Sequence, residues 1–320
     1  MQIEKGYTQA LTSQIKSEIH KVIMAQEGLT DMALTALLSG GHVLIEGVPG
    51  LGKTLWARTL AKVLTVDFKR TQFTADLMPS DILGTKIFDM QKAAFTLRKG
   101  PLFTNLFLAD EINRTPPKTQ SALLEVMEER AITIDGQENK LSEPFLVIAT
   151  QNPIEYEGTY PLPEALTDRF MMKLLLHYPG VAAEKQVLQM VDKGFESANL
   201  SNVDVAPVCT AEAFLRCKAE IRDVRVDESI FNYIVSIAET TRRVNVVSVG
   251  ASPRGSVALL LTAKTFAAMQ GRDYVIPDDV KELAAPILRH RIILKPEAEI
   301  DGVKTDKVIE NILSSVKVPR

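Results

Sequence analysis

The feature that most constrains this chain is the run GVPGLGKT, which follows a short apolar stretch and precedes a helical segment. Its glycines let the backbone turn N–H groups toward an anion, while Lys53 and Thr54 are of the types that contact terminal phosphates and magnesium. A helix starting near Lys53 adds its positive end. The pattern predicts a nucleoside-triphosphate site between a strand and a helix, and it disfavours a flexible loop without a ligand. The residues assigned to this site are Gly47, Val48, Pro49, Gly50, Leu51, Gly52, Lys53, Thr54 and Leu55.

Length and composition are those of an ordinary globular chain. With 320 residues, 46% of them apolar and 24% charged, the chain is long enough for two domains. Its net charge of −3 lacks the basic excess of proteins that live on nucleic acid, although a local basic patch is compatible with it. Nucleic acid is therefore not the expected partner.

The sequence shows no pattern of secretion, membrane insertion or structural metal. Residues 1–5 do not begin an apolar core behind a basic start, and the most apolar later stretch, 257–269, is too short to cross a bilayer. Cys209, Cys217 and four scattered histidines form neither a disulfide framework nor a zinc-ligand pattern. We therefore expect a cytoplasmic protein, without a membrane partner, whose two thiols are reduced and structural.

Buried strands alternate with helices in the first half of the chain. This alternation indicates an α/β fold with a mostly parallel sheet covered on both faces, preceded by two helices within 7–38. The five predicted strands are 43–45, 66–73, 105–109, 144–149 and 170–176.

Two stretches interrupt the alternation and read as inserted hairpins, namely 86–97 and 131–141. After the break at Tyr178-Pro179-Gly180, the pattern is dominated by amphipathic helices, several of which begin with a proline or an acidic cap. We place the boundary there, which predicts an α/β domain at 1–178 and a helical domain at 179–320.

Two adjacent carboxylates, Asp110 and Glu111, follow the apolar run 106–109. A parallel sheet brings them to the edge where ligands bind, beside the phosphate loop. Asp110 is then positioned to hold magnesium through its water shell, and Glu111 to orient the water that attacks the γ-phosphate. An exposed acidic pair at a strand end is the alternative, which the preceding loop makes less favourable.

Three further polar residues are candidates on weaker grounds. Asn152 follows the apolar run 145–149 and could orient the attacking water, but an Asn before a proline is also a common turn. Arg169 and Arg254 are isolated cations near a strand start and a helix start. On the residues alone, surface ion pairs explain both arginines equally well.

Five motifs occur together in the order of an AAA+ ATPase. They are the phosphate loop, LFLADEINR at 106–114, ATQNP at 149–153, DRF at 168–170 and SPR at 252–254. The chain resembles the MoxR family in particular, through GPLFTN at 100–105, PPKTQSALLE at 116–125, QFT at 72–74 and DLMPSD at 76–81. The resemblance covers nearly the whole chain.

The resemblance implies a five-stranded AAA+ P-loop domain and a smaller all-helical lid, with ATP between them and neighbouring subunits in a hexameric ring. It implies that Lys53 and Thr54 bind phosphate and Mg²⁺. Asp110 becomes the magnesium-side acid, Glu111 the general base and Asn152 the first sensor.

Other parts of the chain acquire expected roles by the same resemblance. Arg169 resembles the finger that reaches into the adjacent subunit, although Arg114 competes for that role. Arg254 resembles the second sensor, which the lid carries and which couples loss of the γ-phosphate to the angle between domains. Val22 and Ile23 resemble the segment that packs on adenine, although the family usually has glycine where this chain has Ala25. The two hairpins correspond to insertions that face the ring's pore and contact a substrate.

Several functions stay open at this level. The resemblance favours a chaperone-like motor that remodels or matures a protein client, with metal-cofactor insertion as one outcome and a von Willebrand factor A domain protein as one partner. A nucleic-acid motor and a magnesium-chelatase-like motor subunit are alternatives, as is a small-molecule kinase or nucleotide-gated binding module. Glu111 disfavours a switch that does not hydrolyse, and the two arginines disfavour a solitary kinase.

Overall fold

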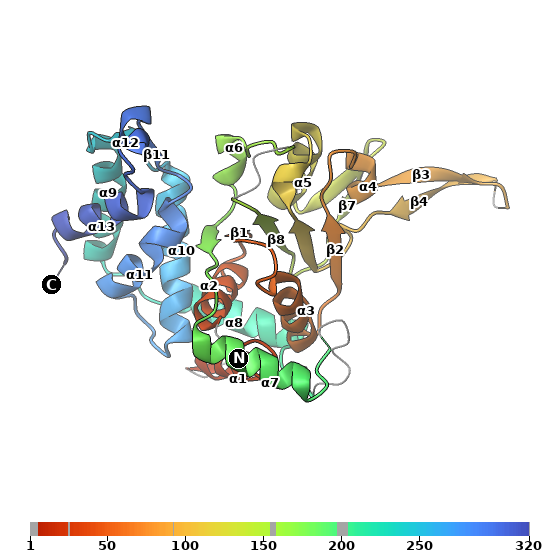
Figure 1. Ribbon diagram of the computed structural model, residues 1–320, viewed down its shortest axis with the longest axis horizontal. Coiled ribbons are helices and arrows are strands. Elements are labelled where there is room, and N and C mark those ends of the chain that lie inside the picture. The colour runs from red at the N-terminus through yellow and green to blue at the C-terminus, as the bar shows by residue number, and fades with distance from the viewer. Residues whose placement is uncertain (1–5, 25, 92, 154–157, 197–203, 320) are drawn as a thin grey trace.

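A five-stranded parallel sheet forms the centre of the first half of the chain, in the order β2-β5-β8-β1-β9 (Figure 1). The computed structural model describes residues 6–24, 26–91, 93–153, 158–196 and 204–319. All five predicted strands are confirmed, and every pairing among them is parallel. The strands are β2 (Phe68–Gln72), β5 (Leu106–Asp110), β8 (Leu146–Gln151), β1 (Val43–Glu46) and β9 (Met172–Leu175).

The central strands are apolar throughout because both of their faces are buried. Along β1, Leu44 packs into one core with Phe107, whereas Val43 and Ile45 pack into a second core on the other face. Successive side chains of a strand point to opposite faces, so a strand covered on both sides needs apolar residues at every position. The continuous apolar runs in the sequence have this cause.

Helices cover both faces of the sheet, as predicted. The face that bears Val43 is covered by α1 (Tyr7–His20), α2 (Glu27–Leu38) and α3 (Lys53–Leu64). The opposite face is covered by α4 (Pro79–Leu83) and α5 (Pro117–Glu129). Two short helical turns, η1 (Ile112–Arg114) and α6 (Glu164–Thr167), complete this part of the chain.

Both predicted hairpins are present and antiparallel. The first pairs β3 (Gly84–Asp89) with β4 (Ala94–Lys99) and projects far from the sheet, at the right of Figure 1. The second pairs β6 (Ala131–Ile134) with β7 (Gln137–Lys140). At the base of the first hairpin, a Cβ on Gly84 would lie 2.6 Å from the backbone nitrogen of Gly100. The two segments can therefore cross there only if glycine occupies this position.

The second half of the chain is mostly helical. Its helices are α7 (Val181–Asp192), α8 (Ala211–Asp223), α9 (Glu228–Arg243), α10 (Pro253–Met269), α11 (Pro277–Leu288), α12 (Pro296–Ile300) and α13 (Thr305–Ser315). Thr210 and Asp227 cap α8 and α9 by accepting backbone N–H bonds, and three of the helices begin at proline. One small antiparallel pair, β10 (Val247–Val249) with β11 (Ile293–Leu294), was not predicted.

The two halves share one apolar core. Phe214 and Ile221 of α8 belong to the same buried cluster as Ile15 of α1 and Leu34 of α2. Arg291, which is 7% exposed, adds a polar tie by donating to Asp168 at 2.7 Å. Within the described ranges, none of the helices has the length and apolar composition that crossing a bilayer needs.

Candidate active site

The phosphate-loop run forms the turn between β1 and α3, at the edge where the parallel strands end. Gly50 and Gly52 have φ angles of 85° and 75°, which residues with a side chain adopt only with strain. Gly47 is required for another reason, because a Cβ there would lie 2.9 Å from the Cβ of Leu176. The predicted strand, loop and helix are therefore in place, and each of the three glycines has a steric reason.

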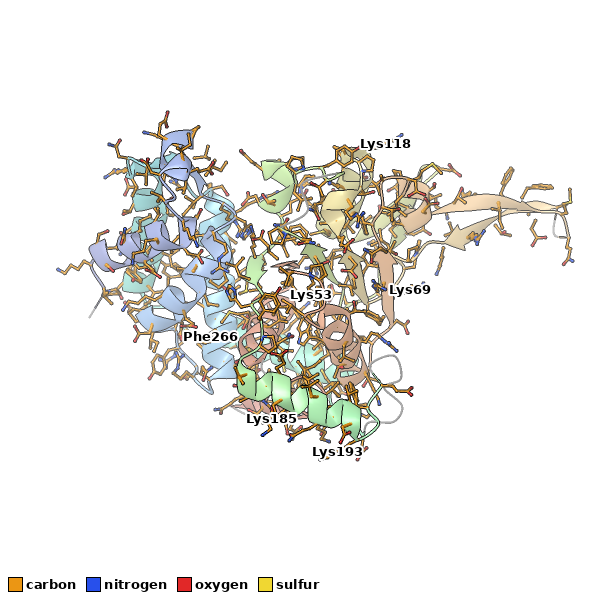
Figure 2. The ribbon with its side chains drawn as sticks, viewed as in Figure 1. Lys53, Lys69, Lys118, Lys185, Lys193 and Phe266 are labelled. Atoms are coloured by element: carbon orange, nitrogen blue, oxygen red, sulfur yellow. The ribbon has the colours of Figure 1, made fainter. Side chains whose placement is uncertain are left out.

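Lys53 is held on the inner side of this loop. Its Nζ donates to the carbonyl oxygen of Gly47 at 2.7 Å, and Figure 2 shows it near the middle of the α/β unit. Burial lowers the pKa of Lys53, while the carboxylates of Asp110 and Glu111 act in the opposite direction. The loop and both acids line one cavity of about 580 Å³, which we call the loop cavity. Its other lining residues are Leu55, Arg58, Arg70 and Gln72.

Asp110 ends β5 and is held by residues of both neighbouring strands. The hydroxyl of Thr150 on β8 donates to its Oδ1 at 2.6 Å. Arg70 on β2 donates to its Oδ2 from Nε at 3.0 Å and from Nη2 at 2.7 Å. The Asp110 side chain is only 12% exposed, so these bonds fix its orientation.

The residues at this edge fit a magnesium ion that is shared with phosphate. The carboxylate of Asp110 and the hydroxyl of Thr54 supply the oxygen ligands that Mg²⁺ prefers, and they line the same cavity. In the described part of the chain, no three His, Cys, Asp or Glu side chains converge into a metal cage. Most of the ion's ligands would therefore come from nucleotide and water.

Glu111 has a left-handed backbone conformation, with φ of 57°. Such a conformation costs about 1–3 kcal/mol for a residue with a side chain, and residues that adopt it occur at turns and helix ends and cluster at functional sites. Its N–H donates to the Thr150 hydroxyl at 2.9 Å, and its Oε2 accepts from Gln72 at 2.7 Å and from Arg114 at 3.3 Å. Gln72 also accepts from Arg70 at 2.7 Å, so one hydrogen-bonded network joins both acids.

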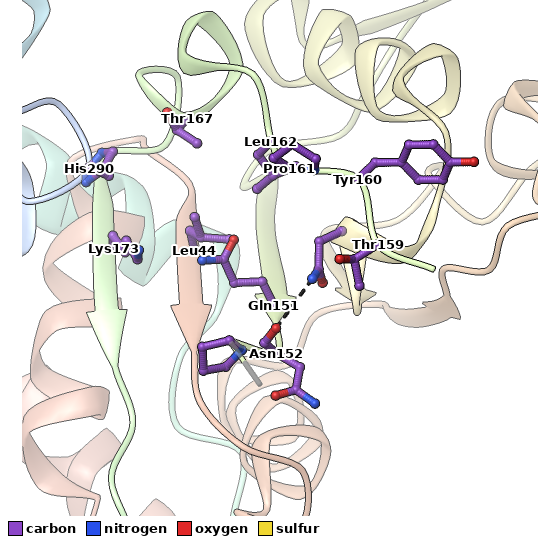
Figure 3. A pocket seen from close by; sticks show the side chains of 12 residues that line it. Leu44, Gln151, Asn152, Thr159, Tyr160, Pro161, Leu162, Thr167, Lys173 and His290 are labelled. Carbon is purple, nitrogen blue, oxygen red and sulfur yellow. Dashed lines mark hydrogen bonds between the residues drawn. The ribbon is translucent and has the colours of Figure 1, made fainter. Parts of the chain in front are cut away.

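Asn152 lies at the same edge of the sheet, beside a neighbouring cavity of about 560 Å³ (Figure 3). Asn152 is buried, and its main-chain carbonyl oxygen accepts a hydrogen bond from Nδ2 of Asn113 at 3.4 Å. Lys173, on another wall of that cavity, pairs at 2.8 Å with Glu46, the residue before the loop. Asn152 is thus close in the fold to the loop, although it does not line the loop cavity.

Arg169 and Arg254 lie together at the opposite edge of the sheet. Arg169 precedes β9 and Arg254 lies in the first turn of α10, and both line a cavity of about 440 Å³. In the described part of the chain, every residue lining the loop cavity precedes Ile112. The structure therefore places Arg254 beside Arg169. In this structure Arg254 does not lie over the phosphate loop of its own chain.

Val22 and Ile23 belong to the buried core, with exposed fractions of 4% and 6%. Neither lines the loop cavity, and Ala25 lies outside the described residues. Gln26, which follows, donates to the carbonyl oxygen of Leu51 at 2.7 Å, so this segment does contact the loop. Their contact with adenine stays a prediction.

Sequence reasoning missed the residues that orient the two acids. Arg70 and Gln72 are two apart on β2, so they share a face of the strand, and Gln72 pairs in register with Asp110. The alternation of the β2 residues contains this information once the order of the strands is known. Because β2 and β5 are separated by a hairpin in the sequence, the pairing could not be read from spacing.

Comparisons with known proteins agree with this geometry. Residues 42–172 match the family described as "ATPase family associated with various cellular activities (AAA)", and residues 239–312 match an AAA lid domain. A crystal structure of a protein from Cytophaga hutchinsonii, named there as a candidate ATPase, is 43% identical and superposes with a TM-score of 0.90. That likeness covers 98% of this chain and 96% of the other.

The curated relatives are similar over most of their length. Chaperone MoxR1 of Mycobacterium tuberculosis is 40% identical, over 95% of this chain and 81% of its own. An uncharacterized protein of Bacillus subtilis, YeaC, is 48% identical over 94% and 92%. Protein MoxR of Methylorubrum extorquens is 27% identical over 96% and 95%.

Proposed function

The chain belongs to the MoxR family of AAA+ ATPases, and on that premise we propose that it hydrolyses ATP between the subunits of a ring to remodel or mature a protein client. One observation supports assembly into a ring. The phosphate loop and the two candidate arginines lie at opposite edges of the same sheet. A complete catalytic site therefore needs two copies of the chain.

The length of the strands supports this reading. The sheet strands have four to six residues, and each residue adds about 3.3 Å, which separates the two edges by roughly 13–20 Å. An arginine at the far edge cannot bridge that distance to its own loop. Rotation about a ring axis brings the far edge of one subunit to the loop of the next. We propose a hexamer in which Arg169 and Arg254 both act on the neighbour's nucleotide.

Within one chain, each residue at the loop edge has a distinct role. Lys53 and the loop N–H groups bind the phosphates, Glu111 orients the attacking water, and Asn152 senses the γ-phosphate. Thr54 and Asp110 would hold Mg²⁺, which supplies neutralising charge at the β and γ oxygens. Arg70 and Gln72 keep the two acids in place.

The exposed side chains of the projecting hairpin β3–β4 favour a protein as the client. Phe88 and Phe95, which are 54% and 71% exposed, contact each other edge to face on one side of the hairpin, with their ring centroids 5.4 Å apart. Met90 is 88% exposed. Exposed aromatic and apolar side chains gathered on a thin projection suit transient contact with an unfolded segment. A relative named as a chaperone agrees with that use, and a von Willebrand factor A domain partner stays part of the proposal.

The proposal is tested by mixing two inactive variants. Arg169→Ala should lower turnover about 10³–10⁵-fold because the finger stabilises charge in the transition state. Glu111→Gln should be inactive because it removes the base. In mixed rings, about a quarter of the interfaces join an intact loop to an intact finger under random assembly, so activity returns in part.

Arg243→Ala is the control, since Arg243 is 74% exposed and pairs with Glu239 within its own helix. It should keep full turnover. Full activity of Arg169→Ala in the assembled state, or no recovery on mixing, would contradict catalysis shared between subunits.

A further inference from the structure

Glu128 joins the two candidate arginines. Its Oε2 forms an ion pair with Arg169 Nη2 at 2.8 Å, and its Oε1 accepts a hydrogen bond from Arg254 Nη2 at 2.8 Å. The three residues come from the last turn of α5, the segment before β9 and the first turn of α10. A single carboxylate therefore holds together two cations from separate parts of the fold.

The cavity around this group is lined by more cationic than anionic side chains. The cavity has four arginines against two carboxylates, Glu128 and Asp168. The Nε of Arg169 is buried and has no hydrogen-bond partner among the described residues. A buried donor without a partner calls for an explanation, and an acceptor supplied by a neighbouring subunit is one. The other two arginines of the cavity are Arg130 and Arg291.

We propose that Glu128 is a positioning residue that stands in for the γ-phosphate of a neighbouring subunit's nucleotide. In the free subunit it pairs with Arg169 and Arg254 and so opposes their contact with a phosphate, and it gives way when the phosphate arrives. This inference rests on the ring proposed above, and it adds that each subunit carries an internal competitor for its own finger.

Physical chemistry favours the exchange. A γ-phosphate offers three acceptor oxygens and more negative charge than a carboxylate, so it can pair with both guanidiniums at once. The side chains of Arg254 and Glu128 are 53% and 41% exposed, and solvent screening keeps their present ion pair weak. If Glu128 stayed in place beside the phosphate, the two like charges would repel each other.

The test is the assembly of Glu128→Gln, measured by sedimentation velocity in a Glu111→Gln background that prevents hydrolysis. Gln keeps the size of the side chain but removes the competing charge. In ATP, the subunit concentration for half-assembly should fall about three- to tenfold, because two exposed ion pairs no longer have to break. In ADP, which lacks the γ-phosphate, it should change much less.

The matched control is Glu129→Gln in the same background, an exposed acid one position further along the helix. It should leave assembly unchanged in both nucleotides. Adding Arg254→Gln should shrink the effect of Glu128→Gln, since one of the two competed cations is then absent. Thermal unfolding and ATP affinity of the dilute subunit report whether the variants fold.

Two results would overturn the inference. One is weaker assembly of Glu128→Gln in ATP, which would make Glu128 a member of the assembled site. The other is an equal shift in ATP and ADP, which would make its role structural. A failure of the wild-type chain to assemble in ATP would remove the ring itself, and it is distinguishable because it needs no substitution at position 128.

Discussion

Arg70 pairs with the carboxylate that would hold Mg²⁺ in the proposed site. It donates twice to Oδ2 of Asp110, and only the Thr150 hydroxyl holds the other oxygen among the bonds described above. A guanidinium neutralises the acid, so Mg²⁺ has to share or displace that contact. If Asp110 holds Mg²⁺ as proposed, Arg70 sets part of the affinity for the ion, which the residues next to Arg70 in the sequence do not indicate.

We expect Arg70→Gln to lower the free Mg²⁺ concentration for half-maximal ATPase activity about three- to tenfold, because the ion no longer competes with a half-exposed ion pair. ATPase activity at saturating ATP, measured across a Mg²⁺ titration, checks this. Lys69→Gln on the same strand is the control, since successive residues point to opposite faces. An unchanged Mg²⁺ midpoint in Arg70→Gln would show that Arg70 does not compete with the metal.

His42 links folding to pH at the far edge of the sheet. Its Nδ1 accepts the N–H of Val147 at 3.0 Å, so its Nε2 carries the proton and donates to the carbonyl oxygen of Met127 at 3.2 Å. Burial lowers the pKa of His42 to about 4 from the ordinary 6.5. The unfolded chain therefore binds the proton first as the pH falls.

The stability that the neutral ring contributes is full above the unfolded pKa of about 6.5 and is lost as the pH falls through about 4, on the order of 3 kcal/mol in all. Burial also depresses the pKa of His290, with the same sign. We expect His42→Gln to be less stable at neutral pH but to lose less on acidification. Urea unfolding at several pH values measures this, and parallel pH dependences of the two proteins would contradict it.

At the scale of elements, the hairpin β3–β4 contributes little to the stability of the rest of the fold. Its aromatic pair is mostly exposed, so the aromatic rings contribute contact surface and not core. We expect Phe88→Ser with Phe95→Ser to weaken binding of a reduced, carboxymethylated unfolded protein about tenfold, while the thermal midpoint stays unchanged. Fluorescence anisotropy measures that binding.

Val181→Ser with Leu188→Ser is the matched control, because these side chains on α7 are 88% and 66% exposed and lie away from the hairpin. If it loses as much binding, the hairpin has no special role. Salt-sensitive binding of single-stranded DNA that disappears with the two phenylalanines would instead favour a nucleic-acid motor.

Local patterns predicted the elements well and their meeting points poorly. The starts of α3 at Lys53 and of α9 at Glu228 follow from adjacent residues, namely the glycines of the loop and the cap at Asp227. Short elements such as α4, α6 and β10 were missed, because they are stabilised by tertiary contacts and not by their own periodicity. The network of Arg70 with Asp110 depends on strand order, which no local pattern encodes.

At the scale of the whole molecule, the two halves should unfold together. Trp56, the single tryptophan, is fully buried in α3, and the core it belongs to continues into α8 and α13. We expect its fluorescence and the far-ultraviolet ellipticity of the helices to give one thermal midpoint, as a shared core requires. Two separated midpoints would show that the helical part folds by itself.

The position of Arg254 is also a property of the whole molecule. The order of motifs predicted that α10 carries this arginine, and the helix is confirmed. Its placement at the edge opposite the loop follows from how α10 packs against α2 and α11, which sequence order alone does not determine. The boundary at residues 178 and 179 stays a prediction.

The crossing of Gly84 and Gly100 restricts which residues can be substituted in the hairpin β3–β4. Any larger residue at either position would collide with the backbone of the segment that crosses it. The outer part of the hairpin meets no such restriction, so substitutions at its tip leave the crossing intact. If the hairpin binds clients as proposed, exchanging its tip for that of a relative changes which client is bound and leaves the nucleotide site unaltered.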